Sequence, residues 1–144
     1  MKLLAIDPGT HESGFVLFDG QSVLDTGVIP NDDVMARVRA HQGPLAVEMI
    51  ASYGMPVGRE VFETCVLIGR MIEAHEGAQT LVYRRDVKLH LCGTARAKDA
   101  NVRQALIDLL GAPGTKKAPG PTYGVKSHAW AALGVAVTAL ASTD

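Results

Sequence analysis

Three short apolar runs open this 144-residue chain, and their close spacing constrains the fold more than any other feature of the sequence. Residues 2–6 (KLLAI), 14–20 (GFVLFDG) and 21–29 (QSVLDTGVI) are bounded by the turn signals DPG and DG. Each run has the length and composition of a strand. Three strands joined by short turns predict an antiparallel meander.

Helix and strand patterns alternate in the rest of the chain. A helix is predicted over residues 31–41, with Asn31 or Asp32 as its N-cap, and a strand over residues 43–50. A strand that follows a helix indicates a crossover and parallel pairing. A helix from near Pro56 and a fifth strand over residues 78–84 come next.

Residues 85–98 are expected to form a loop, followed by a helix over Asp99–Leu110 and a last helix capped by Ser127. The predicted order is β-β-β-α-β-α-β-α-α. This order is typical of an α/β domain with a mixed five-stranded sheet flanked by helices.

The helix from Pro56 carries more apolar residues than one buried face requires. A stripe at steps of 4, 4, 3 and 4 is expected to face the core: Val57, Val61, Cys65, Ile68 and Ile72. Phe62, Val66 and Met71 lie off this stripe. They indicate either burial on two sides or contact with a second subunit, and we favour the subunit contact.

Length and composition predict one domain over residues 1–144. The chain is 47% hydrophobic, shows no internal repeat, and has low complexity only in the loop over residues 111–121. Its longest apolar run, residues 129–141, is too short to span a membrane. Cys65 and Cys92 match no disulfide or zinc pattern, so reduced thiols in a cytoplasmic protein are expected.

Charge is divided unevenly along the chain. Residues 1–83 carry five Lys or Arg against eleven Asp or Glu, whereas residues 84–126 carry nine against three. A basic second half favours a polyanionic partner, although the same charges could be spread over a solvated surface. The candidate phosphate contacts are Arg84, Arg85, Lys88, Arg96, Lys98, Arg103, Lys116 and Lys117.

Two carboxylates stand at strand-like segments. Asp7 follows the first strand, where it could merely cap the DPG bend, and Glu48 lies inside the apolar segment LAVEMI. A buried glutamate needs a cation or a hydrogen-bond donor. If the first and fourth strands are neighbours, Asp7 and Glu48 converge, and two carboxylates suit a hard cation such as Mg²⁺ or Mn²⁺.

Four segments together resemble RuvC-type Holliday junction resolvases of the short, phage-like kind: AIDPGTHESGFVLF, VEMIAS, VYRRDVKLHLCGTARAKDANVRQAL and SHAWAALGVAVTAL. The resemblance covers nearly the whole chain. It implies a ribonuclease-H-like fold, a homodimer, and Mg²⁺- or Mn²⁺-dependent cleavage of two opposed strands of a four-way DNA junction. It also implies a phage- or bacterium-encoded protein that acts in the bacterial cytoplasm.

The resemblance also assigns residues. Asp7 and Glu48 match acidic metal ligands, and Lys98 matches a lysine in a loop that lies near DNA. His128 stands where the family has aspartate or histidine, and Ala131 stands where it has its final catalytic aspartate. In the parent enzyme Asp7 would bridge two metal ions, and residues 48 and 131 would each hold one of them. His128 would be a metal ligand or would orient the water or the leaving group.

Ala131 is the one departure from this pattern, because alanine has no oxygen to offer a metal ion. The chain is then either an engineered, cleavage-deficient form or a natural variant that binds DNA without cutting it well. We favour the first because the other motifs are intact.

Three other functions remain open from the sequence. The chain could be a branched-DNA-binding protein, or a nuclease of other branched DNA such as Y-forks and flaps. A D-x-G-T turn also occurs in actin-like ATPases, but these need two lobes around a nucleotide.

Tyr53 and Phe62 are candidates for stacking on an unpaired base near the crossover of a DNA junction, although ordinary packing is favoured for Phe62.

Overall fold

A computed structural model describes residues 1–142 as a five-stranded sheet with helices on both faces. The strands are β1 (Leu3–Asp7), β2 (Glu12–Phe18), β3 (Val23–Pro30), β4 (Leu45–Met49) and β5 (Gln79–Tyr83). The helices are α1 (Asn31–Ala40), α2 (Arg59–Ala74), α3 (Arg84–Cys92), α4 (Asp99–Leu110) and α5 (Ala129–Ser142). None of these helices is long and apolar enough to cross a membrane.

The sheet has the order β3-β2-β1-β4-β5. β1 to β3 form an antiparallel meander, and β1, β4 and β5 are parallel to one another. The predicted mixed five-stranded sheet and its helical flanks are therefore confirmed. β1 lies at the centre of the sheet, so the residue that ends it is placed beside β4 rather than at an exposed edge.

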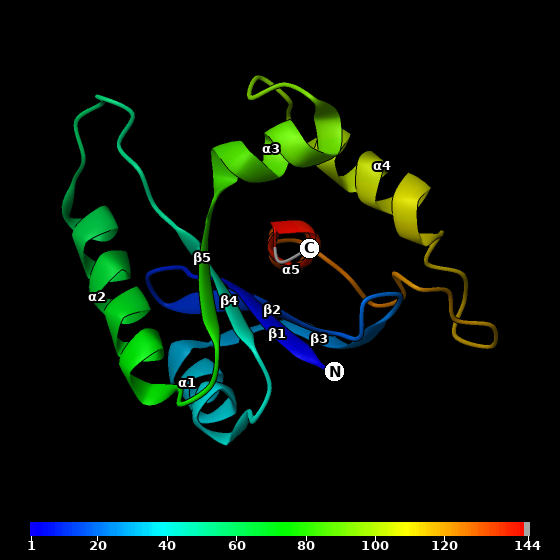
Figure 1. The fold of residues 1–144 in the computed structure, drawn as a ribbon, viewed down its shortest axis with the longest axis horizontal. Coiled ribbons are helices and arrows are strands. Elements are labelled where there is room, and N and C mark those ends of the chain that lie inside the picture. The colour runs from blue at the N-terminus through cyan, green and yellow to red at the C-terminus, as the bar shows by residue number, and fades with distance from the viewer. Residues whose placement is uncertain (143–144) are drawn as a thin grey trace.

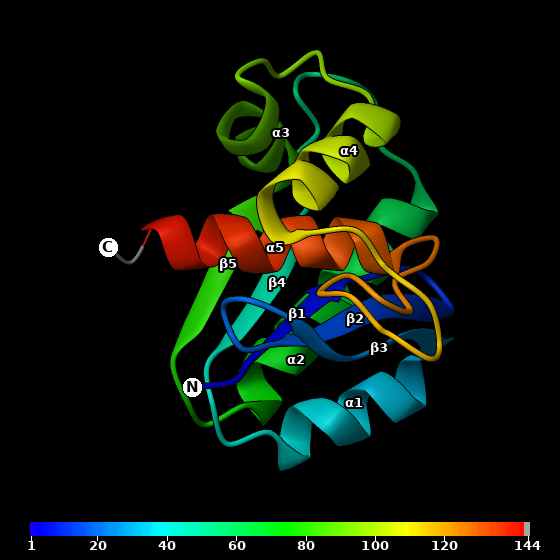
Figure 2. The same ribbon diagram turned by 90° about the vertical axis from the view of Figure 1, so that its right-hand side faces the viewer.

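Two hydrophobic cores lie on opposite faces of the sheet. α5 packs directly on one face, with α3 and α4 beyond it, and α1 and α2 cover the other face (Figures 1 and 2). Alternate residues of β1 enter the two cores: Ala5 lies under α5, and Ile6 lies on the side of α1 and α2.

The expected loop after β5 is wrong, because Arg84–Cys92 forms α3 and the order ends in three helices. Val87 is buried and Leu91 packs against the same core, which gives the helix a narrow apolar face. Five of its nine residues are charged or histidine, and Leu89 is exposed, so the apolar pattern alone did not reveal the helix. The helix ends at Gly93, whose φ of 75° lies in the left-handed region that glycine favours.

The predicted core stripe of α2 is confirmed only at Ile68 and at Ile72, which is partly buried against the same core. Thr64, Leu67, Ile68 and Met71 are the buried residues, and only Ile68 belongs to the predicted stripe. Val57 precedes the helix and is exposed. Since α2 has apolar residues on more than one face, the sequence could not decide which face meets the sheet.

The predicted N-caps of two helices are wrong as well. α1 begins directly after Pro30, and the Asn31 side chain instead makes hydrogen bonds with the turn that follows β1. α5 begins at Ala129, and Ser127 has a φ of 51°, which differs from the extended backbone of an N-cap.

Candidate active site

Asp7 and Glu48 face the same side of the sheet because of strand register. Ala5 of β1 pairs with Ala46 of β4, and both pack in the core under α5. Two residues further along each strand, side chains return to that face. Asp7 and Glu48 therefore lie side by side at the ends of neighbouring parallel strands, at the edge of the α5 core.

Burial dominates the electrostatics of this carboxyl pair. The side chain of Asp7 is only 13% exposed, and burial raises its pKa, while a hydrogen bond with Glu48 and the charge of Arg84 lower it. Burial, followed by the hydrogen bond and the charge of Asp7, raises the pKa of Glu48 to about 8. Two carboxylates this close cannot both ionise cheaply, so the pair retains a proton at neutral pH when no cation is bound.

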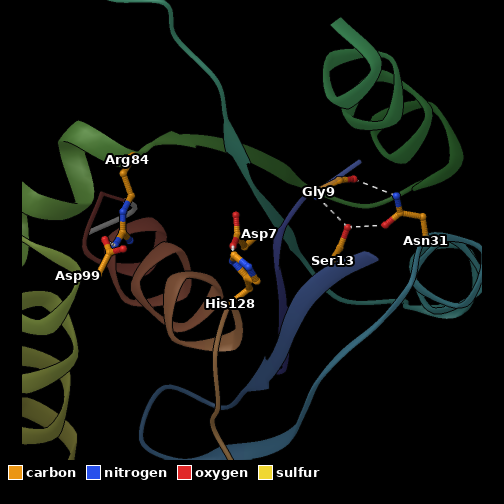
Figure 3. Close-up of polar contacts among 7 residues, drawn as sticks. All are labelled: Asp7, Gly9, Ser13, Asn31, Arg84, Asp99 and His128. Atoms are coloured by element: carbon orange, nitrogen blue, oxygen red, sulfur yellow. Dashed lines mark hydrogen bonds and ion pairs between the residues drawn. The ribbon is translucent and has the colours of Figure 1, made fainter. Parts of the chain in front are cut away.

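His128 is the third member of the site. Its Nδ1 lies 3.3 Å from Oδ2 of Asp7, and its ring remains 68% exposed (Figure 3). His128 directly precedes α5, and its ring lies beside the residue that ends β1. A protonated imidazole would pair with Asp7, whereas a neutral one could serve as a ligand or hold a water molecule.

Gly14 permits this close approach, and sequence analysis did not identify it. Gly14 pairs with Asp7 across the antiparallel strands. A Cβ atom at Gly14 would lie 2.6 Å from the carbonyl of His128 and 2.8 Å from the nitrogen of Ala129. Only a residue without a side chain lets the start of α5 lie against β2, and a glycine inside a strand was the available signal.

The turn after Asp7 is held by a hydrogen-bond network. Nδ2 of Asn31 donates to the carbonyls of Gly9 and Thr10, at 2.9 and 3.1 Å. The hydroxyl of Ser13 donates to Oδ1 of Asn31 at 2.7 Å and accepts from the N–H of Gly9 at 3.2 Å (Figure 3). These bonds fix the DPGT turn, and with it the direction of the Asp7 side chain.

Ala131 lines a cavity of about 290 Å³ together with His128, Arg84 and Asp99. Its methyl group provides no ligand on this side of the site. Nη2 of Arg84 donates to Oδ1 of Asp99 at 2.7 Å, and this contact lowers the pKa of Asp99 (Figure 3). Asp99 was expected only as the first residue of a helix, and Arg84 only as one of the general phosphate contacts.

The carboxyl pair fits a divalent cation. Oε1 of Glu48 is buried without a hydrogen-bond partner, and a bound cation would both satisfy it and replace the shared proton. No group of three or more His, Cys, Asp or Glu side chains within residues 1–142 is arranged as a complete metal cluster. The donor set thus suits a cation held by Asp7 and Glu48, with water or a substrate oxygen filling its other positions.

The predicted phosphate contacts fall into separate groups. Arg84, Arg85 and Lys88 stand on α3 and line a cavity of about 280 Å³ with Tyr53, which is exposed. The others are exposed on the α3–α4 loop (Arg96, Lys98), on α4 (Arg103) and on the loop before α5 (Lys116, Lys117). Among the residues that line the cavities beside Asp7 and Arg84, neither Lys116 nor Lys117 occurs.

No family model matches this sequence, and no curated protein matches it. Solved structures do. RuvC of Thermus thermophilus, determined alone and in complex with a Holliday junction substrate, is 22% identical to this chain with a TM-score of 0.65. Each alignment covers 96% of this chain and 92% of the RuvC chain. The chain therefore has the RuvC-like, ribonuclease-H-like fold.

Proposed function

We propose that this protein is a metal-dependent, structure-selective endonuclease that resolves four-way DNA junctions by paired phosphodiester cleavage. The observation that supports this function best is the buried Asp7–Glu48 pair, with His128 on Asp7, at the end of the central strand of a RuvC-like fold. One of the similar RuvC structures contains a Holliday junction substrate.

Asp7 and Glu48 would hold Mg²⁺ or Mn²⁺, which when bound activates a water molecule and stabilises charge on the scissile phosphate. His128 completes the metal site or orients the attacking water from the exposed side of Asp7. The hydrogen bonds of Asn31 and Ser13 keep the Asp7 turn in place, so that the carboxylate needs no rearrangement when a cation arrives.

Ala131 weakens cleavage in this chain. Where a carboxylate would hold a second ion, the cavity wall is a methyl group. Loss of a catalytic metal ligand removes several kcal/mol of transition-state stabilisation, so we expect cleavage to be slower by ~10³-fold or more than with aspartate at this position.

Branched DNA would be bound through the basic residues of α3, the α3–α4 loop and α4. One of them, Arg84, stands near Asp7 (Figure 3). We also propose that residues 1–144 form one nuclease domain and that the protein acts as a homodimer. Two opposed strands of a junction require two active sites, which a symmetric dimer provides. We further propose, from the likeness to RuvC of a bacterium, that it acts in the bacterial cytoplasm, whether a phage or a bacterium encodes it.

The test is restoration of the missing carboxylate. Ala131→Asp should raise the rate of nicking of a synthetic four-way junction by ~10³-fold in Mg²⁺ or Mn²⁺. The double variant Ala131→Asp, Asp7→Asn is the matched control and should be inactive, since it loses the central carboxylate. If Ala131→Asp cuts no faster than the native chain, position 131 does not belong to the metal site.

Ala131 also favours a second candidate, a branched-DNA-binding protein that does not cleave. A panel of four-way junctions, Y-forks, flaps and plain duplex separates the candidates. Tight junction binding without cleavage by either the native chain or Ala131→Asp identifies the binding protein. Equal cleavage of Y-forks and flaps identifies a nuclease of branched DNA in general.

A further inference from the structure

Arg84 stands on the side of the site where Ala131 leaves a ligand missing. It is the first residue of α3, directly after β5, and β5 is the neighbour of β4. The carboxyl ends of parallel strands lie at one edge of a sheet, so Arg84 and Glu48 emerge at the same edge. The charge of Arg84 lowers the pKa of both Asp7 and Glu48, which places the guanidinium within the field of the pair.

The guanidinium is held at one end and unsatisfied at the other. Nη2 donates to Asp99 at 2.7 Å, whereas Nη1 is buried and has no hydrogen-bond partner. The side chain as a whole is 25% exposed and borders the cavity that Ala131 and His128 also line. A buried N–H without an acceptor is costly, and none of the described residues supplies that acceptor to Nη1.

We propose that Arg84, oriented by Asp99, binds a non-bridging oxygen of the scissile phosphate and supplies positive charge on the side of the site that lacks a ligand at Ala131. An entering phosphate oxygen provides the acceptor that Nη1 lacks. Guanidinium groups bind phosphate through a planar, directional fork, so one fixed by a carboxylate is already oriented for its substrate. Asp99 is a positioning residue, because it acts through Arg84. This inference rests on the proposed nuclease function.

The proposal predicts effects of opposite sign on two ligands. The guanidinium repels a divalent cation at Asp7 and Glu48 but attracts phosphate. Arg84→Gln should therefore bind Mn²⁺ alone roughly 3- to 10-fold more tightly, as measured by calorimetry without DNA. The same variant should bind a four-way junction roughly 10-fold more weakly and cut it at least ~10-fold more slowly at saturating Mn²⁺.

The matched control is Arg39→Gln, which removes an exposed arginine from α1 on the other face of the sheet and should change none of these quantities. Arg84→Lys keeps the charge but loses the planar guanidinium, so it should retain native Mn²⁺ affinity and still bind the junction more weakly. If Arg84→Gln does not fold, Arg84→Lys tests the proposal in its place. Asp99→Asn should weaken junction binding, and combining it with Arg84→Gln should add little further loss of junction affinity, because the contact of Asp99 with Arg84 is what orients the guanidinium.

Unchanged or weaker Mn²⁺ binding by Arg84→Gln, or native junction affinity, overturns the proposal. A purely structural role would weaken both ligands together. The proposed nuclease function fails separately, if neither the native chain nor Ala131→Asp cuts a junction. In that case the Mn²⁺ and junction affinities of the Arg84 variants still decide whether Arg84 is a phosphate-binding residue.

Discussion

Glu48 illustrates how a single residue can cost stability and serve a function. Its side chain leaves a buried oxygen without a partner, next to a second carboxyl group. An apolar residue at this strand position would pack without such a cost. The arrangement makes physical sense if a cation takes the place of the shared proton.

The raised pKa of Glu48 has a consequence for stability in the absence of divalent cations. The folded protein keeps the proton up to about pH 8, whereas the unfolded chain releases it near pH 4.5. Stability is therefore greatest below pH 4.5 as far as this group is concerned, and it falls as pH rises towards 8. We expect a loss of roughly 2–4 kcal/mol in the free energy of unfolding across this window.

Glu48→Gln should remove most of this dependence of the free energy of unfolding on pH and make the metal-free protein more stable than the native chain at pH 8. Urea unfolding at several pH values in EDTA measures the free energy of unfolding. Glu60→Gln, which changes an exposed glutamate on α2, should keep the native slope. A native slope in Glu48→Gln would mean that another group holds the proton.

At the residue scale, the sequence predicted the side chains that break a local rule. Glu48 interrupts an apolar strand and Asp7 follows one, so both were visible in the pattern. Asp99 breaks no local rule, and a glycine in a strand, such as Gly14, is only a weak signal. Their roles depend on which backbone lies opposite Gly14 and which side chain reaches Asp99, and both are tertiary contacts that no local pattern specifies.

Among the elements, α2 presents an outward apolar face. Phe62 and Val66, one helical turn apart, are 61% and 65% exposed. The prediction that Phe62 packs against the rest of the protein is therefore wrong for the residues that the structure describes. Two large apolar side chains together on a helix surface are typical of a contact surface. We expect this face to form the dimer contact that paired cleavage requires.

Phe62→Glu and Val66→Glu should each place a charge in that contact and shift the protein to a monomer, as measured by sedimentation velocity. Leu109→Glu on α4 is the matched control, because Leu109 is a similarly exposed apolar residue elsewhere. Its oligomeric state should equal that of the native chain. If the native chain is a monomer at micromolar concentration, the α2 face has another purpose.

Strands and helices with clear apolar patterns were predicted well. Features that depend on tertiary packing, such as the buried face of α2, were not. The strands and α4 could be located because local residues specify them. α3 was missed because most of its residues are polar and its single buried residue, Val87, gives no periodicity. The face of α2 was misassigned because several faces are apolar, and only contact with the sheet selects one of them.

For the whole molecule, the division of charge along the sequence becomes a division in space. Residues 1–83, which carry a net negative charge, form the sheet, α1 and α2, whereas α3, α4 and the loop between them hold six of the fourteen Lys and Arg residues. α3 and α4 lie on the opposite side of the sheet from α1 and α2 (Figure 2). DNA bound there would contact these basic groups, so we expect counterion release to contribute strongly to the affinity.

Junction affinity should accordingly fall steeply with salt. Lys98→Ala and Arg85→Ala should each reduce the slope of log affinity against log salt by about 0.9, the value for one lost phosphate contact. Fluorescence anisotropy with a labelled junction measures the slope, and Arg70→Ala on α2 should leave it unchanged. Native slopes for both Lys98→Ala and Arg85→Ala would place the DNA elsewhere.

α5 lies between the sheet and the outer helices, and it is built almost entirely from buried small and apolar residues. His128 directly precedes this helix, and Ala131 lies in its first turn. The rigidity of the interior therefore sets how accurately the imidazole is aimed. A small loss of packing anywhere along α5 would displace the imidazole before the protein unfolds. The cleavage rate should therefore fall at temperatures below the unfolding transition.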